Sequence, residues 1–463
     1  MTHYHFIGIG GAGLSPIARI LFEKGHYISG SDMNLSPSAQ RLQELGVKVY
    51  LGHNASNIKG ANVIIRSSAI QDSNAEVAAG IAVGIPVIKR SDFLADLTAG
   101  KKVIAVAGTH GKTTTTAMIA WVLTQCGLDP TYLIGGISKN LNSNAHAGGG
   151  EYFVIEADEY DGMFLGLKPD FLVITVVEHD HPDFYPTVKS YFDAFFALTR
   201  LIKPGGYLIA DMDNSGSRKV MDNAPKNTNQ FYYGTTAQAD YVIDQIQHKP
   251  GCGVCFAIFS AAHGGESQIS EIFNLPIPGN HNAHNAAAAI ALAQLIGLPL
   301  DKIKAALESF IGTGRRYDVK SIANEITIID DYAHHPTEIR ATLSAARCQF
   351  PNQQIWVVWQ PHTYSRTREL IEDFKNAFID CDHVIVTEIF ASREKKQDYS
   401  SREVIKLINH KDVRLISDLK NTSDFLVKHL VPGDVLLVLS AGDADQVSKD
   451  VINALGGNKG ATK

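Results

Sequence analysis

The first hundred residues alternate short apolar runs with longer stretches of helical periodicity. Residues 3–9 (HYHFIGI) and 26–30 (HYISG) have the length and composition of buried strands, and apolar positions recur at helical spacing over residues 14–24 between them. The same alternation continues through residues 63–68 and 85–90. This order of elements predicts a βαβ start and a parallel sheet.

A polar, glycine-containing stretch at residues 97–102 interrupts this pattern before a new apolar run at 103–108. Strands are then predicted at 152–158, 171–177 and 206–211, and an alanine-rich helix at 283–297. Residues 230–275 read as short strands and turns and predict an antiparallel insertion.

A second break, Gly312-Thr313-Gly314, precedes a further alternating region. Its strand-like runs are residues 326–330, 355–360, 383–389, 413–417 and 434–440. A chain of 463 residues is too long for one core, so we predict three α/β domains at 1–98, 99–312 and 313–463.

Composition excludes several classes of protein. Hydrophobic residues make up 45% of the chain and charged residues 19%, and no apolar run approaches the roughly 20 residues that a membrane helix needs. The first residues lack the pattern of a secretory signal, so we expect a cytoplasmic protein without a membrane span. A net charge of −6 gives no global attraction to nucleic acid, and any phosphate ligand must be held by local groups. The sequence leaves open whether the chain acts as a monomer or a homodimer.

Five cysteines form an odd and sparse set, which favours reduced thiols over a disulfide framework. Cys252 and Cys255 have CxxC spacing, which suits zinc or redox chemistry. Because no second pair accompanies them, two small apolar side chains on a strand is the simpler interpretation.

The first motif is the loop Gly8-Ile9-Gly10-Gly11-Ala12-Gly13 after the first predicted strand, with Asp32 closing the second. Glycines let the backbone approach a pyrophosphate, and the following helix offers unpaired N–H groups. The motif indicates a diphosphate nucleotide but does not distinguish NAD from others, and a tight turn without a ligand stays possible.

The second motif, Gly108-Thr109-His110-Gly111-Lys112-Thr113, lies between an apolar strand and a helix and predicts a phosphate-binding P-loop. Val106 stands where the full pattern has glycine, so Gly108 and Gly111 must make the turn. Lys112 would place a charge near the β- and γ-phosphates, and the Thr113 hydroxyl would bind Mg²⁺.

Two acidic clusters follow apolar strands, at residues 156–161 and 178–183. Carboxylates this close repel one another, and a bound cation such as Mg²⁺ offsets that cost. Either cluster alone could be a solvated loop, but their common place at strand ends beside a P-loop favours a metal site.

Polar clusters also occur at residues 281–285, 315–317, 330–336 and 360–368. Asn282 and Asn285 are either helix caps or groups that recognise a purine edge. The other three clusters put arginines, histidines and an acid at predicted strand ends, where they could clamp phosphate, ribose and a carboxylate, or simply be solvated.

With these motifs, the fold class is α/β in three domains: an N-terminal Rossmann-like domain, a central P-loop ATPase-type domain and a C-terminal Rossmann-like domain. The strings GIGGAG, GTHGKTTTT, EADEYDG, EHDHPD, GNHNAHNAAAA, GTGRRYD, DDYAHHPTEI and QPHTYSRTRE occur in this order. Together they resemble the Mur ligase family, and the resemblance spans almost the whole chain.

The resemblance implies an ATP- and Mg²⁺-dependent ligase of peptidoglycan synthesis that joins L-alanine to UDP-N-acetylmuramate through an acyl phosphate. It implies a UDP-sugar site of Gly10, Gly11, Ala12, Gly13, Ser31, Asp32, Ser67 and Ser68. It implies an ATP site of Gly108, Thr109, His110, Gly111, Lys112, Thr113, Thr114, Asn282, Asn285, Arg316 and Asp331.

By the same resemblance, Thr113, Glu156 and His181 bind metal, and Lys112, Glu156 and His181 are catalytic. Tyr332, His334 and Arg366 would position the amino acid. The nearest alternative is a recycling ligase that adds a murein tripeptide to the same sugar nucleotide. An NAD-dependent dehydrogenase would leave the P-loop unexplained, and a non-catalytic nucleotide switch would hydrolyse ATP without an amino acid.

Overall fold

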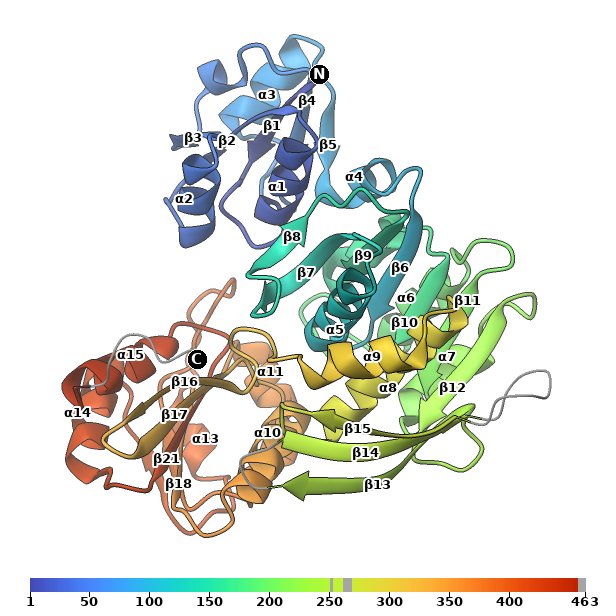
Figure 1. The fold of residues 1–463 in the computed structure, drawn as a ribbon. Coiled ribbons are helices and arrows are strands. Elements are labelled where there is room, and N and C mark those ends of the chain that lie inside the picture. Colours follow the sequence, from blue (N-terminus) through green and yellow to red (C-terminus); the bar gives the residue numbers. More distant parts are fainter. Residues whose placement is uncertain (250–252, 261–268, 457–463) are drawn as a thin grey trace. The chain divides into compact units, whose positions relative to one another are not determined.

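The computed structural model describes residues 1–249, 253–260 and 269–456, which form two compact units built from separate segments. The first unit comprises Met1–Glu178, Val188–Tyr241 and Ala288–Ala306. The second comprises His179–Thr187, Val242–Ala287 and Leu307–Lys463. Figure 1 labels the helices and strands of both units.

The first unit begins with a five-stranded sheet in the order β3-β2-β1-β4-β5, and every neighbouring pair is parallel. Its strands are β1 (His3–Ile7), β2 (Tyr27–Asp32), β3 (Lys48–Leu51), β4 (Val63–Arg66) and β5 (Val87–Lys89). Between and after them lie α1 (Ser15–Glu23), α2 (Pro37–Glu44), the 3-10 helix η1 (Ala55–Ile58), α3 (Ala75–Ala82) and α4 (Arg90–Leu97). The predicted parallel βαβ start is confirmed.

The next strands of the first unit run in the order β12-β11-β10-β6-β9-β7-β8. They are β6 (Lys102–Ala107), β7 (Thr131–Ser138), β8 (Ser143–His146), β9 (Tyr152–Glu156), β10 (Phe171–Ile174), β11 (Tyr207–Asp211) and β12 (Asn229–Gly234). The helices here are α5 (Lys112–Gln125), η2 (Tyr160–Gly166), α6 (Val188–Thr199) and α7 (Ser215–Asp222).

Two features of this region differ from the sequence prediction. The pair β7–β8 is antiparallel and was not predicted, and β12 pairs in parallel with β11 although it lies in the stretch predicted to be antiparallel. Helix α7 separates β11 from β12 and provides the crossover that a parallel neighbour requires. The antiparallel prediction holds for β14 and β15.

Strand β13 (Tyr241–Lys249) begins at the boundary, with Tyr241 in the first unit and its other residues in the second. The second unit also contains β14 (Gly253–Ser260), β15 (Ile269–Leu275) and a six-stranded sheet in the order β16-β17-β21-β18-β19-β20. The strands of that sheet are β16 (Asp318–Ala323), β17 (Ile326–Asp331), β18 (Ile355–Trp359), β19 (His383–Val386), β20 (Val413–Leu415) and β21 (Val435–Leu439). All pairs are parallel except the unpredicted edge pair β16–β17.

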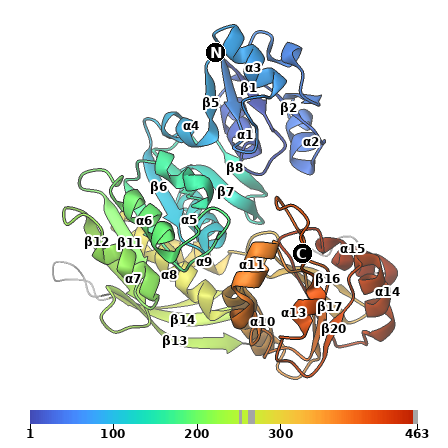
Figure 2. The same cartoon turned by 180° about the vertical axis from the view of Figure 1, so that it is seen from behind.

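Helices cover both faces of the six-stranded sheet (Figures 1 and 2). They are α10 (Pro336–Gln349), α11 (Tyr364–Glu369), α12 (Ile371–Phe374), α13 (Ser401–Ile405), α14 (Leu419–His429) and α15 (Asp445–Ala454). Val357 and Trp359 of β18 pack on the face covered by α10, whereas Trp356 and Val358 pack on the face covered by α14 and α15. This alternation along one strand is that of a strand buried on both faces.

The alanine-rich helix predicted at 283–297 is α8 (Asn280–Leu295), and α9 (Leu300–Glu308) follows it. The chain passes from one unit to the other within each of these helices. Among the described residues, no helix combines the length and apolar character that a bilayer crossing requires.

The described cysteines form no disulfide bonds. Cys255 lies on β14 and donates a hydrogen bond to Asn274 Oδ1 over 2.9 Å. Its CxxC partner Cys252 lies outside the described residues.

Candidate active site

The glycine-rich loop after β1 folds against the end of β2. The N–H of Gly10 donates to Asp32 Oδ2 over 2.9 Å, and Ser36 Oγ donates to the carbonyl of Gly10 over 2.8 Å. A Cβ at Gly10 would lie 2.7 Å from Ser36 Oγ, so a side chain here would have to displace that hydroxyl. Gly11 and Ala12 are exposed at the tip, and the loop leads into the N-terminus of α1, where N–H groups lack intrahelical partners. The loop therefore has the geometry of an anion-binding turn.

Ser67 and Ser68 follow β4 at the same edge of the sheet. Ser67 is half-buried against the loop, since a Cβ at Gly8 would lie 3.3 Å from Ser67 Cβ, whereas Ser68 is exposed. Strands β1 and β4 pair in parallel, so their carboxyl ends bring these serines beside the glycine loop.

Ser31, predicted near uridine, is fully buried and belongs to a polar network. Its hydroxyl donates to Glu76 Oε2 over 2.5 Å and lies 2.9 Å from His53 Nδ1. Asn57 Nδ2 donates to the other oxygen of Glu76 over 2.6 Å. Burial alone would raise the pKa of Glu76, but hydrogen bonds from His5, Ser31 and Asn57 lower it to about 2. In this geometry Ser31 supports the residues around it through Glu76.

The P-loop joins β6 to α5 through two glycines with left-handed backbones. Gly108 has φ +139° and Gly111 has φ +84°. A Cβ at Gly108 would lie 2.1 Å from Thr175 Oγ1, and Thr175 Oγ1 donates to the carbonyl of His110 over 2.5 Å. The backbone angle and the close neighbour both exclude other residues at position 108. Thr114 follows in the first turn of α5 and is buried.

Lys112 begins α5 and folds back over this loop. Its Nζ donates to the carbonyls of Gly108 and Thr109 over 2.6 and 3.1 Å and lies 2.7 Å from Glu159 Oε2. The Lys112 side chain is 13% exposed and that of Glu159 is 1% exposed. Burial would lower the pKa of Lys112, but Glu159 and Asp158 raise it above its ordinary value, so the ammonium stays charged.

Glu156 ends β9 beside Thr113. Thr113 Oγ1 donates to Glu156 Oε1 over 3.0 Å, and the N–H of Gly135 on β7 donates to Glu156 Oε2 over 2.7 Å. Burial raises the pKa of Glu156, and Lys112 opposes the rise. A buried carboxylate beside a hydroxyl is a set of oxygen ligands that suits Mg²⁺.

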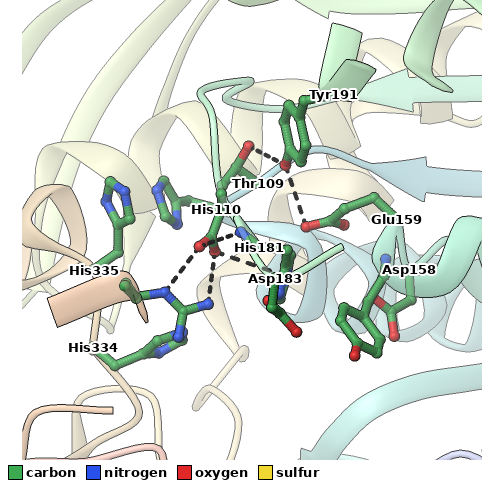
Figure 3. Close-up of polar contacts among 12 residues, drawn as sticks. Thr109, His110, Asp158, Glu159, His181, Asp183, Tyr191, His334 and His335 are labelled. Atoms are coloured by element: carbon green, nitrogen blue, oxygen red, sulfur yellow. Dashed lines mark hydrogen bonds and ion pairs between the residues drawn. The ribbon is translucent and has the colours of Figure 1, made fainter. Parts of the chain in front are cut away.

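Thr109 connects the P-loop to the segment after β10 and to α6. Its Oγ1 accepts from the N–H of Glu178 over 3.0 Å and donates to the Glu178 carbonyl over 2.7 Å. It also lies 2.7 Å from the Tyr191 hydroxyl, which lies 3.4 Å from Glu159 Oε1, as Figure 3 shows. His110 Nε2 lies 2.5 Å from Glu178 Oε1. The P-loop is thus anchored both to the segment after β10 and to α6.

In the second unit, Asn282 and Asn285 occupy the first turns of α8 and are buried. Asn282 Nδ2 donates to the carbonyl of Pro278 over 2.7 Å, and Asn285 Nδ2 donates to Asn282 Oδ1 over 3.2 Å. These bonds fix the orientation of both amides. They agree with a local structural role and do not test the predicted contact with adenine.

Asp331 lies at the end of β17 and already accepts several bonds from the chain. It accepts from the N–H groups of Tyr317 and Ala333 over 2.8 and 2.7 Å. Burial raises the pKa of Asp331 to about 6, against the pull of Arg316. Arg316 lies over the Tyr332 ring, 5.0 Å from its centroid. These side chains form a compact cluster at the strand end.

Arg366 on α11 is 2% exposed and forms a two-pronged ion pair with Asp180. Its Nε and Nη2 donate to the two carboxylate oxygens over 2.8 and 3.1 Å, and its Nη1 lies 3.1 Å from His362 Nδ1. Burial would raise the pKa of Asp180, but Arg366 holds it well below its usual value. The His334 ring stacks edge-on with His362 at 5.5 Å. Residues from three separate sequence motifs, those containing Asp180, His334 and Arg366, are therefore brought together here.

His181 follows Asp180 and has a left-handed backbone with φ +55°, which is uncommon for histidine. Its N–H donates to Asp180 Oδ1 over 2.7 Å. His181 belongs to the second unit and Glu156 to the first, so a joint role of the two side chains stays a prediction.

Sequence reasoning missed several side chains that shape this site. Glu159 was visible in the acidic cluster, but its pairing with Lys112 could not be read from spacing. Tyr191 comes from a helix far along the chain, and Gly135 comes from an unpredicted strand. The sequence feature that could have indicated Glu159 is the cluster of carboxylates at residues 156–161, because a buried lysine such as Lys112 needs a carboxylate partner.

The fold and the site define a P-loop nucleotide-binding enzyme of three α/β domains. Three family models match successive parts of the chain: "Mur ligase family, catalytic domain" at residues 3–102, "Mur ligase middle domain" at 106–293 and "Mur ligase, glutamate ligase domain" at 315–442. The chain belongs to the Mur ligase family, which uses ATP.

Individual relatives match over nearly the whole chain. A UDP-N-acetylmuramate–L-alanine ligase of Geobacter sp. (strain M21) is 41% identical over 97% of this chain and 96% of its own length. The crystal structure of the UDP-N-acetylmuramate–alanine ligase of Thermotoga maritima matches with a TM-score of 0.82 and 27% identity, covering 98% of this chain and 99% of that one. A murein peptide ligase from Psychrobacter arcticus shares the fold, with a TM-score of 0.73 at 24% identity and coverage of 98% and 99%.

Proposed function

We propose that this protein is the ATP-dependent ligase that joins L-alanine to UDP-N-acetylmuramate, the first peptide step of peptidoglycan synthesis. Relatives that are about 40% identical over nearly their full length carry this activity in their names. The observation that carries the proposal is the P-loop, where Lys112, Thr113 and Glu156 gather a cation and oxygen ligands around a phosphate-binding turn. We expect the enzyme to act in the cytoplasm, where its ATP is available.

We propose that the work divides among domains at 1–98, 99–312 and 313–463. In the first, Gly10, Gly11, Ala12 and Gly13 hold the diphosphate, with Asp32, Ser67 and Ser68 beside them. Ser31 acts through the buried Glu76 to shape the floor of this site, since its hydroxyl is committed to that carboxylate. The monomer and the homodimer are both compatible with this division.

ATP would occupy the P-loop. The residues Gly108, Thr109, His110, Gly111, Lys112, Thr113 and Thr114 line its turn, and Asn282, Asn285, Arg316 and Asp331 supply adenine, phosphate and ribose contacts. Lys112 faces the phosphates after exchanging its bonds with the Gly108 and Thr109 carbonyls for phosphate oxygens. This exchange keeps the ammonium partnered throughout.

Thr113 and Glu156 would hold a Mg²⁺ ion, with His181 as a further ligand. The residues fit this ion because burial disfavours the ionised form of Glu156, and a divalent cation offsets that cost. When bound, Mg²⁺ supplies electrostatic neutralisation of the phosphate charge. The N–H of Gly135 orients Glu156, which holds the second carboxylate oxygen in place.

In the first step of the reaction two anions, the lactyl carboxylate and the triphosphate of ATP, must come together; the amide forms in the second step. The lactyl carboxylate of the sugar attacks the γ-phosphorus of ATP in line, which forms an acyl phosphate and releases ADP. The uncharged amine of L-alanine then attacks the acyl carbon, loses a proton and expels phosphate. Lys112 neutralises charge as the first step proceeds, and Tyr332, His334 and Arg366 position the amino acid.

ADP release tests this proposal directly. The purified protein should release ADP with UDP-N-acetylmuramate only when L-alanine is present, and the product should gain the mass of one dehydrated alanine residue. ADP release that needs a murein tripeptide instead, with the matching mass, would assign the recycling reaction. Release that needs neither the sugar nor an amino acid would contradict both.

A further inference from the structure

Arg90, the first residue of α4, has a partly buried guanidinium on which the carboxylates of Asp158, Glu156 and Asp161 act through space, without a direct ion pair among the described residues. Its Nε atom is fully covered, and the guanidinium makes no hydrogen bond or ion pair with residues 1–249, 253–260 and 269–456. Covering a charged group without hydrogen bonds costs free energy that structures normally avoid. A cation in this state indicates an anionic ligand.

The position of the guanidinium identifies where that ligand lies. A Cβ at Gly13 would lie 1.8 Å from Arg90 Nη1 and 2.6 Å from Cζ, so the guanidinium lies directly against the glycine loop. On its other side, Arg90 lines a cavity of about 10 Å³ together with Glu156 and Asp158. That cavity holds no more than about one water molecule. The guanidinium therefore lies between the glycine loop and a cavity too small for an anionic ligand.

The glycine loop needs a further donor. The N–H groups of Gly10, Gly11 and Leu14 already donate to Asp32 Oδ2 and to the carbonyls of Gly8 and Gly11. These bonds reduce the number of backbone donors left for a ligand at the N-terminus of α1. A helix N-terminus supplies only partial charge, whereas a diphosphate carries a full charge on each phosphate.

The carboxylates of the P-loop region also oppose an anion here. Glu156 and Asp158 lie close enough to act on the charge of Arg90. Without the guanidinium between them, these acids would repel a diphosphate held by the glycine loop. The Arg90 guanidinium would therefore lie between the carboxylates of Glu156 and Asp158 and a diphosphate at the glycine loop.

We propose that Arg90 is a further binding residue for the sugar nucleotide, and that its guanidinium binds the diphosphate held by the glycine loop. The inference rests on the proposed function and extends it to a residue outside the glycine motif. A planar guanidinium can bond two phosphate oxygens at once, which a lysine cannot do. Gly13 is then required because any side chain would displace this group.

Calorimetric titration of Arg90→Gln with UDP, UMP and ADP tests the inference. The variant should bind UDP roughly 10- to 100-fold more weakly, because hydrogen bonds to charged groups contribute about 1.5–3 kcal/mol. The loss for UMP should be smaller, and the affinity for ADP should be unchanged. Arg90→Lys should bind UDP with intermediate affinity, and Lys89→Gln, an exposed neighbour, should bind like the unaltered protein.

Three outcomes would overturn the inference. They are unchanged UDP affinity in Arg90→Gln, an equal loss for UMP and UDP, and a loss confined to ADP, which would assign the anion to the ATP side. If Arg90→Gln does not fold, as judged by its thermal unfolding, the comparison is made with Arg90→Lys. Failure of the unaltered protein to bind UDP at all would instead contradict the proposed function.

Discussion

Gly135→Ala tests how closely the position of Glu156 controls the reaction. A Cβ at Gly135 would lie 2.5 Å from both carboxylate oxygens of Glu156. Ordinary van der Waals contact begins near 3.4 Å, so the carboxylate must move by about 0.9 Å. The backbone of Gly135 lies outside the left-handed region, so alanine brings no backbone strain.

We expect this variant to fold normally and to react slowly. The moving group is the end of a flexible side chain, and Gly→Ala at a compatible position changes stability by no more than about 1 kcal/mol. A misplacement of about 1 Å costs up to roughly 100-fold in rate, or about 2.7 kcal/mol of transition-state stabilisation. The Mg²⁺ concentration for half-maximal activity should rise as well, because the proposed metal ligand Glu156 has been displaced.

The assay is ADP release at saturating UDP-N-acetylmuramate and L-alanine over a range of Mg²⁺, with thermal unfolding measured alongside. Gly149→Ala is the matched control, because the N–H of Gly149 also donates to a carboxylate over 2.7 Å, that of the exposed Asp129. A Cβ there would lie 3.3 Å from Asp129 Oδ2, so little has to move. A kcat of Gly135→Ala within about threefold of the control would refute the proposed role of Glu156.

Three further predictions follow from buried charges. Lys112→Met removes the cation beside the buried Glu159 and should lower the free energy of unfolding by about 3–5 kcal/mol. Adding Glu159→Gln should restore most of that stability but no ADP release, and a double variant as unstable as the single one would contradict the pairing. The fold lowers the pKa of Glu76 from 4.5 to about 2. Ionised Glu76 therefore contributes about 3 kcal/mol to the free energy of unfolding at pH values above 4.5, and this contribution is lost as the pH falls toward 2. The difference in thermal midpoint between the unaltered protein and Glu76→Gln should therefore shrink from pH 7 to pH 3, and a constant difference would argue against it. Arg366→Lys keeps the charge beside Asp180 but loses the two-pronged bond, so both stability and the KM for L-alanine should worsen, and no change in either would show that the pair is dispensable.

Many of the parallel strands were predictable because their residues are apolar on both faces, and α/β order then follows from the helices between them. Edge strands were harder, since β8 and β16 carry polar residues and pair only at the rim of a sheet. Parallel pairing of β12 depends on a crossover through α7 that local pattern does not reveal. Periodicity therefore identified many of the buried strands, but it missed β7, which pairs in parallel with β9 inside its sheet.

The motifs correctly located the two glycine-rich turns, because glycine acts there through local backbone geometry. Val106 illustrates this: it lies within β6, paired with Val173, so the strand continues past the point where the full pattern has glycine. Contacts from distant segments were not predictable in the same way. Ser31 bonds Glu76 and Lys112 meets Glu159 only because the fold brings them together. The ligand roles of the predicted residues stay predictions until ligands are measured.

The hydroxyl of Thr109 anchors the P-loop to Glu178 and Tyr191 in the protein without a ligand. A turn that keeps its conformation in the free protein does not have to be ordered when a ligand arrives, so association loses little entropy in the chain. At the proposed ATP site, contacts to the phosphates would then add to the affinity without a further cost of ordering Thr109 and its neighbours.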